Sequence, residues 1–151
     1  MARGFLYEIA TDMEILGEMD ESDFYHLVGC EADYFQNESD NHSVEGLIYI
    51  LKQFGMEAGI QKDAAGREHP WFSFSKENRE EFFRKRFART KEIIDKMTLE
   101  EFSTDVTTLM CTIDESFSDA MYFKDSIYSM DHFFRAMEPG RYYIGNVVLM
   151  G

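Results

Sequence analysis

The sequence predicts a single α+β domain, residues 1–151, with a mostly antiparallel sheet and four to five helices. The composition, 44% hydrophobic and 15% aromatic in 151 residues, is that of a chain able to bury one core. No repeat and no Pro-, Gly- or Ser-rich linker divides the chain. The order of strand and helix patterns does not alternate regularly, which favours α+β over a doubly wound fold.

Strand patterns lie at both ends of the chain. Residues 4–9 are aromatic and β-branched, with Phe5, Tyr7 and Ile9 on one side. Residues 142–150 are apolar at both alternating positions, which is typical of an interior strand covered on both faces. We expect these two strands to pair. Residues 118–124 are a further strand candidate.

Two helices are predicted in the first third. Asp20 or Ser22 can cap a short helix that Gly29 ends, and Ser43 is a good N-cap for a second helix that ends at Gly55. Their apolar positions follow helical spacing: Phe24, Leu27 and Val28 in the first, and Val44, Leu47, Ile48, Leu51 and Phe54 in the second.

A hairpin and a long helix follow. Residues 56–61 and 69–74 flank a polar turn, so they are predicted to pair. Pro70 cannot donate to a strand ladder, so the second strand is predicted to be an edge strand or to begin after it. Ser75 caps the longest predicted helix, about 76–96, and we expect its buried seam to run along Phe83, Phe87, Thr90, Ile94 and Met97.

Two more helices complete the predicted elements. Thr98 and Glu101 form a capping box before a run of helically spaced apolar residues that begins at Leu99. Ser129 caps a short helix that ends at Pro139.

The chain shows the features of a cytoplasmic protein. It opens without the apolar run of a signal peptide and has no apolar stretch long enough to cross a bilayer, so no membrane contact is predicted. Cys30 and Cys111 are 81 positions apart and form no Cys-x-x-Cys motif. We therefore expect two reduced thiols and no disulfide.

Charge is unevenly distributed around a net value of −14. Residues 1–45 hold twelve acids and one base, whereas residues 76–96 hold eight bases and five acids. An acidic surface repels phosphate backbones, so direct nucleic-acid binding is not expected. The basic helix 76–96 is the most unusual feature. Either it offsets the acidic remainder, or it docks an acidic protein or a second copy of the chain through Arg84, Lys85, Arg89 and Lys96.

The motifs of nucleotide binding and of serine hydrolases are absent, and no cofactor is predicted. The histidines are scattered. Asp114, Ser116 and Ser118 have the spacing of the start of a calcium loop, but Asp119 stands where that loop needs glycine and Asp125 where it needs glutamate. We therefore predict no metal site and assign no catalytic residue.

Three weaker candidates have structural explanations. His26 and Cys30 are four residues apart and could form a base and nucleophile pair, although a free cysteine is more often a small packing residue. The acidic run from Asp12 to Asp23 could supply catalytic carboxylates, although helix-capping charge on a solvated face explains it as well. Trp71 could line a ligand cleft or a partner site, or it could be part of the core.

The favoured hypothesis is a non-enzymatic, acidic protein-binding or accessory domain that acts through its charged surface. One alternative is a small hydrolase with a carboxylate or Cys/His site in a cleft. Another is an acidic mimic of nucleic acid that occupies a DNA-binding protein. A deep pocket with convergent polar groups would favour the enzyme.

Overall fold

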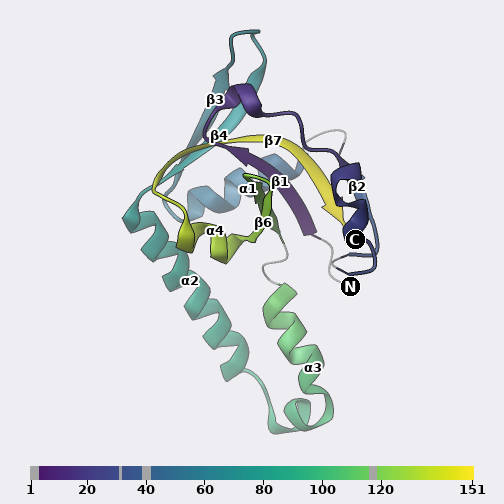
Figure 1. Cartoon of the computed structure of the whole chain (residues 1–151). Coiled ribbons are helices and arrows are strands. Elements are labelled where there is room, and N and C mark those ends of the chain that lie inside the picture. Colours follow the sequence, from purple (N-terminus) through teal and green to yellow (C-terminus); the bar gives the residue numbers. More distant parts are fainter. Residues whose placement is uncertain (1–3, 31, 39–41, 116–118) are drawn as a thin grey trace.

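The computed structural model describes residues 4–30, 32–38, 42–115 and 119–151, and its described part is an α+β domain (Figure 1). Seven strands form one sheet in the order β3-β4-β7-β1-β5-β6, with β2 paired to β7. The strands are β1 (Gly4–Ala10), β2 (Phe35–Asn37), β3 (Glu57–Lys62), β4 (Glu68–Phe74), β5 (Ala120–Phe123), β6 (Ser126–Ser129) and β7 (Gly140–Met150). Of the described pairs only β1 with β5 is parallel, so the sheet is mostly antiparallel, as predicted.

Four α-helices and two 3-10 helices are present in the described residues. They are η1 (Met13–Ile15), η2 (Glu21–Leu27), α1 (His42–Gln53), α2 (Lys76–Asp95), α3 (Leu99–Glu115) and α4 (Met130–Ala136). Ser75 caps α2, which is the longest, and Ser129 caps α4, so both predictions are confirmed. No helix in the described part of the chain is long and apolar enough to cross a membrane.

The two terminal strands pair at the centre of the sheet, as the sequence predicts. β1 and β7 are antiparallel, with Leu6 opposite Val148 and Ile9 opposite Ile144. The register shifts between Tyr7 and Ile9, so β7 carries one extra residue there. The backbone N–H of Asn146, which lies in this bulge, donates a hydrogen bond to the buried carboxylate of Glu8.

Apolar side chains cover both faces of the central strands. On one face Tyr7, Phe72 and Val147 pack with the apolar sides of α1, α4 and the first turns of α2. On the other face Leu6 and Val148 pack with a smaller set supplied by the segment that contains η2. Because both faces of the sheet are covered here, the last strand carries apolar residues on both of its faces.

Two local predictions need correction. α1 begins at His42, so Ser43 lies in its first turn, where its N–H and hydroxyl bond to the Glu38 carboxylate. β4 begins at Glu68 and lies between β3 and β7, so it is not an edge strand. Pro70 is tolerated because the pairing with β7 begins only at the next residue.

The predicted buried seam of α2 is wrong beyond its first turns. Phe82 is 1% exposed, whereas Phe87 is 69% and Ile94 is 50% exposed. The helix runs on past the edge of the body, so its later apolar residues meet no layer of the fold (Figure 1). α3 follows and is bent at Asp105, whose φ of −156° and ψ of 71° are not helical. We call the part of α2 after Phe83 together with α3 (residues 84–115) the arm.

Candidate functional site

All four predicted partner-binding bases lie on the arm with exposed side chains, and three of them contact only acids of their own helix in the described interactions. Arg84 contacts Glu81 at 2.6 Å, and Glu92 is contacted by Lys96 at 2.7 Å and by Arg89 at 3.7 Å. The three side chains remain 60–75% exposed. Exposed pairs within one helix contribute only about 0–1 kcal/mol, so these bases can be redirected to another molecule at small cost.

Lys85 has a structural partner in the body. Its ammonium group donates to the Gln53 carbonyl at 2.6 Å, at the C-terminal end of α1, and lies 5.7 Å from the centre of the Phe54 ring. A cation at this position satisfies an otherwise unpaired carbonyl and complements the helix dipole. Lys85 therefore anchors the arm to the body.

Two other bases of α2 attach it to α4 and to the residue that follows α4. Arg86 lies 2.7 Å from Asp131 of α4, and both side chains are about four-fifths buried. Burial raises the pKa of Asp131, although the charges of Arg86 and Arg135 act in the opposite direction. Arg79 donates to the Met137 carbonyl. The basic helix thus divides into a half that is bound to the body and a half that is not.

Large apolar side chains are exposed along the free half. On α2 these are Phe87 and Ile94, and on α3 they are Leu99, Phe102, Val106 and Met110, with exposed fractions from 38% to 82%. A small hollow of about 270 Å³ separates the end of α2 from the start of α3, lined by Ile93 and Met97 among others. Among the described side chains, these exposed apolar residues of the two helices therefore do not bury each other.

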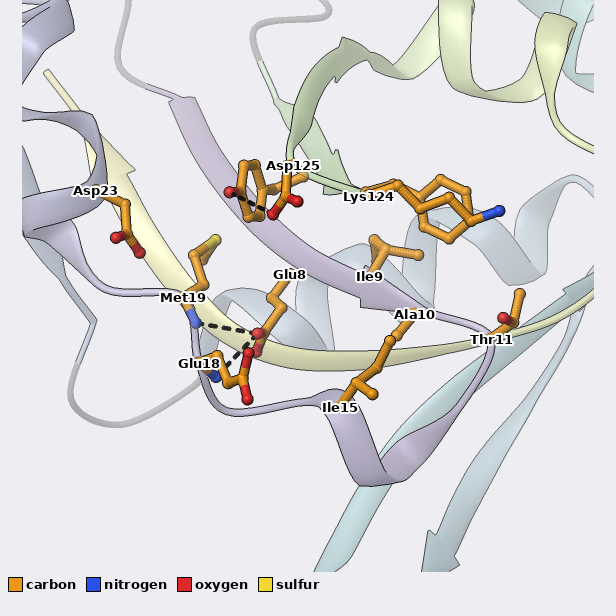
Figure 2. A pocket seen from close by; sticks show the side chains of 12 residues that line it. Glu8, Ile9, Ala10, Thr11, Ile15, Glu18, Met19, Asp23, Lys124 and Asp125 are labelled. Atoms are coloured by element: carbon orange, nitrogen blue, oxygen red, sulfur yellow. Dashed lines mark hydrogen bonds between the residues drawn. The ribbon is translucent and has the colours of Figure 1, made fainter.

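A hollow lies on the opposite face of the sheet from α1 and α4, beside the first strand (Figure 2). It has a volume of about 460 Å³, and its wall includes Glu18, Asp23, Tyr122, Lys124 and Asp125. Tyr122 donates to Asp125 at 3.4 Å. Several carboxylates surround this hollow, so it is where the hydrolase alternative has to be tested.

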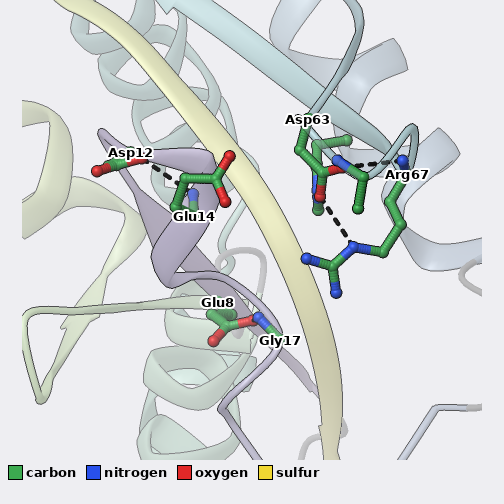
Figure 3. Close-up of polar contacts among 8 residues, drawn as sticks. Glu8, Asp12, Glu14, Gly17, Asp63 and Arg67 are labelled. Carbon is green, nitrogen blue, oxygen red and sulfur yellow. Dashed lines mark hydrogen bonds and ion pairs between the residues drawn. The ribbon is translucent and has the colours of Figure 1, made fainter.

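Glu8 lies at the floor of this hollow and is 6% exposed. One carboxylate oxygen accepts from the N–H groups of Gly17 at 2.8 Å (Figure 3) and of Asn146 at 2.9 Å. The other accepts from Glu18 at 3.1 Å and Met19 at 3.0 Å (Figure 2). A carboxylate has about four acceptor positions, so this one is fully used.

Glu8 is therefore explained by the fold, because it fastens the loop after η1 to the bulge in β7. Gly145 adjoins it, and a Cβ built on Gly145 would lie 2.0 Å from a Glu8 oxygen. The sequence analysis missed both residues. Their signal was an acid inside an otherwise apolar strand and a glycine inside an apolar strand.

The acidic run that follows also has structural uses. Asp12 accepts from the Glu14 N–H at 2.9 Å in η1, and Asp20 accepts from the Ser22 N–H at 2.9 Å in η2 (Figure 3 shows the first). Asp23 completes a capping box with Asp20. Short 3-10 helices leave many N–H groups without partners, and these carboxylates accept from them. The helix-capping explanation fits better than a catalytic pair.

The Cys30 and His26 candidate is not assembled. Cys30 is an exposed free thiol in the turn after η2, so the expectation that it packs in the core is wrong. Its backbone N–H bonds to the Leu27 carbonyl, and the chain turns at Gly29. The side chain of Cys111 lies outside the described residues.

Trp71 has a structural environment in the hairpin of β3 and β4. Arg141 stacks over its ring at 3.6 Å, and the ring lies so close to Gly59 that an added Cβ would be 2.9 Å away. The ring is half-buried and held on both sides, but it belongs to neither cluster of core residues, so it packs on the sheet outside the core.

The turn of the same hairpin is organised by Asp63, whose side chain is buried. It accepts from the Arg67 guanidinium at 2.9 Å (Figure 3) and from His69 at 2.8 Å. The hydrogen bond from His69 is the largest cause that lowers the pKa of Asp63 to about 2, and Arg67 and two backbone N–H groups act in the same direction.

Metal binding has no assembled ligand set in the part of the chain that the structure describes. No three His, Cys, Asp or Glu side chains there are grouped so that they could hold an ion. The calcium-like spacing that begins at Asp114 includes residues 116–118 and lies partly outside the described residues.

Comparisons with protein-family models, curated proteins and solved structures found no match, so the argument for function depends on this chain's own residues.

Proposed function

We propose that this chain is a non-enzymatic protein-binding domain that binds its partner through the arm. The observation that supports this most is the unburied apolar seam of α2 and α3, in which Phe87 is 69% and Leu99 is 82% exposed. Apolar side chains gathered on a projecting segment are characteristic of a protein contact.

The exposed bases support the same surface. Arg84, Arg89 and Lys96 lie beside the apolar seam and contact only acids of their own helix in the described interactions. Arginine beside an apolar seam is typical of protein interfaces, where its guanidinium group can donate two hydrogen bonds to one carboxylate. An acidic partner with an apolar strip would satisfy both parts of this surface.

The hydrolase alternative receives less support. The buried carboxylate in the hollow beside β1 is Glu8, and all its acceptor positions bind backbone N–H groups. The nucleic-acid mimic also receives less support, because acids such as Asp12, Asp20 and Asp23 accept from local backbone groups. A mimic needs carboxylates that are spaced for a partner.

Photo-crosslinking in the cells that express the chain tests the proposal. A benzophenone amino acid replaces Phe87 on the arm, and the matched control replaces Ile60, an apolar residue of β3 that is 65% exposed. We expect a discrete crosslinked protein band from position 87 and none of that mass from position 60. Equal labelling at both positions, or none at position 87, would refute binding through the arm.

A further inference from the structure

The partner that the arm fits best is another arm. We propose that two copies of this chain associate through their arms, with α2 of one copy against α3 of the other, in a four-helix arrangement. This inference rests on the proposed protein-binding role of the arm and names its occupant. It follows from the charges of the two helices, the apolar surface between them and the symmetry of pairs.

The two helices carry opposite charge. The segment 76–96 holds eight bases and five acids, whereas the segment 99–115 holds five acids and no base. Residues 97 and 98, which join the two segments, are uncharged. Each arm therefore presents a basic strip and an acidic strip, and each strip is the complement of the other.

Two-fold symmetry would form this contact between opposite charges twice in each dimer. In a two-fold dimer the same patch is used by both subunits, so a contact between α2 and the partner's α3 is repeated by α3 and the partner's α2. Arms that lie antiparallel place the start of one α3, with Glu100 and Glu101, near the exposed half of the other α2, with Arg84 and Arg89. Opposite charges then meet along both helix pairs.

The apolar surface of the arm is large enough for a stable pair. With about 200 Å² for a large apolar side chain, the exposed fractions of Phe87, Ile94, Leu99, Phe102, Val106 and Met110 amount to on the order of 700 Å². A standard interface buries about 800 Å² on each partner. Phe87 and Ile94 are seven residues apart and share one side of α2, as an interhelical seam requires.

The body leaves this surface open to a second copy. α2 is anchored by Lys85, Arg86 and Arg79 on the side that meets the sheet layer and α1, so the rest of the helix projects (Figure 1). Four helices that share one apolar centre are a stable arrangement, whereas two helices that barely touch are not.

Reciprocal charge reversal tests the pairing. The first variant carries Arg84→Glu with Arg89→Glu, and the second carries Glu100→Lys with Glu101→Lys. None of these residues contacts the body in the described interactions. Each variant alone places like charges on facing helices, whereas a mixture of the two again places opposite charges on both helix pairs. The matched control, Lys52→Glu with Lys62→Glu, changes the net charge as much as the first variant does.

The readout is sedimentation velocity at about 0.15 M salt. We expect each variant alone to dissociate about tenfold more readily than the wild type, or more, which corresponds to about 1.4 kcal/mol or more. The equimolar mixture should regain wild-type association, and the control variant should associate as the wild type does. If the double variants do not fold, Arg84→Glu and Glu100→Lys serve in the same design.

Two results would overturn the inference: a wild type that stays monomeric up to a few hundred micromolar, or a mixture that associates no better than its components. Its failure is distinguishable from failure of the proposed function. A monomeric wild type whose position 87 crosslinks to a different protein keeps the binding role and refutes only the second copy. A monomeric wild type with no crosslink at position 87 refutes both.

Discussion

Two phenylalanines five residues apart on α2 are predicted to have very different effects on stability. Phe82 is 1% exposed and lies against Phe54, Phe83 and Phe134, with ring centres 4.9–5.1 Å apart. Phe82→Ala removes these contacts and leaves a cavity, which costs about 3–5 kcal/mol in the free energy of unfolding.

Phe87→Ala should cost far less in the monomer. With 69% of the residue exposed, only about 60 Å² of its surface is buried, equivalent to about 1.5 kcal/mol at about 25 cal/mol per Å². Alanine keeps the Cβ contacts, so we expect a loss below about 1 kcal/mol. In a dimer the effect of Phe87→Ala depends on protein concentration. A contact that forms only in the dimer stabilises the fold more as the protein concentration rises.

Urea unfolding at two protein concentrations measures both effects. At about 1 μM the Phe87→Ala midpoint should lie near that of the wild type, while Phe82→Ala lies well below it. At about 200 μM the wild type should gain stability that Phe87→Ala does not gain. A loss of about 3 kcal/mol for Phe87→Ala at the low concentration would show that the ring is buried within one chain. That result would refute the arm as a free surface.

Three further predictions concern the body. Glu8→Gln places an amide NH₂ group, which is a donor, against backbone N–H groups that need an acceptor. The free energy of unfolding in urea should therefore fall by at least about 2 kcal/mol. For the control Glu18→Gln, at the rim of the same hollow, it should change by less than about 0.5 kcal/mol. Equal effects would contradict the role given to Glu8. Gly145→Ala should lower the melting temperature because the added Cβ meets the Glu8 carboxylate. The control Gly46→Ala, in open space on α1, should stabilise the fold by about 0.5–1 kcal/mol. An unchanged melting temperature for Gly145→Ala would mean that the carboxylate lies elsewhere. The pKa of Asp63 is about 2 in the folded chain and 3.8 ordinarily, so its stabilising effect is complete above about pH 4 and is lost as the pH falls through about 2. Acid unfolding of wild type and Asp63→Asn should therefore diverge least near pH 2, and a difference that grows toward low pH would contradict this sign.

The main elements were predictable because their signals are local. Ser75 and Ser129 are N-caps, Thr98 with Glu101 forms a capping box, and apolar spacing distinguishes helix from strand. The pairing of the first and last strands followed from their apolar character, since interior strands are covered on both faces. β2 and β6, with three and four residues, are too short to carry a periodic pattern.

The predictions that failed depend on where segments that are far apart in the sequence lie in the folded chain. The seam of α2 is periodic over its whole length, but periodicity does not tell where the body ends, so Phe87 and Ile94 were wrongly placed in the core. Glu8 and Asn146 lie 138 positions apart in the sequence, and only the bulge in β7 brings them together. All four predicted binding bases are exposed, but Lys85 also contacts the body, which only the fold reveals because it places the end of α1 beside that side chain.

The molecular mass of the wild-type chain in solution tests most directly the claim that the arm binds a second copy. Sedimentation equilibrium at a few hundred micromolar should give twice the chain mass of 17.7 kDa. The same measurement on Phe87→Glu with Leu99→Glu should give the single-chain mass with an unchanged circular dichroism spectrum. A wild-type mass of one chain, or a dimer that these two substitutions leave intact, would contradict the claim.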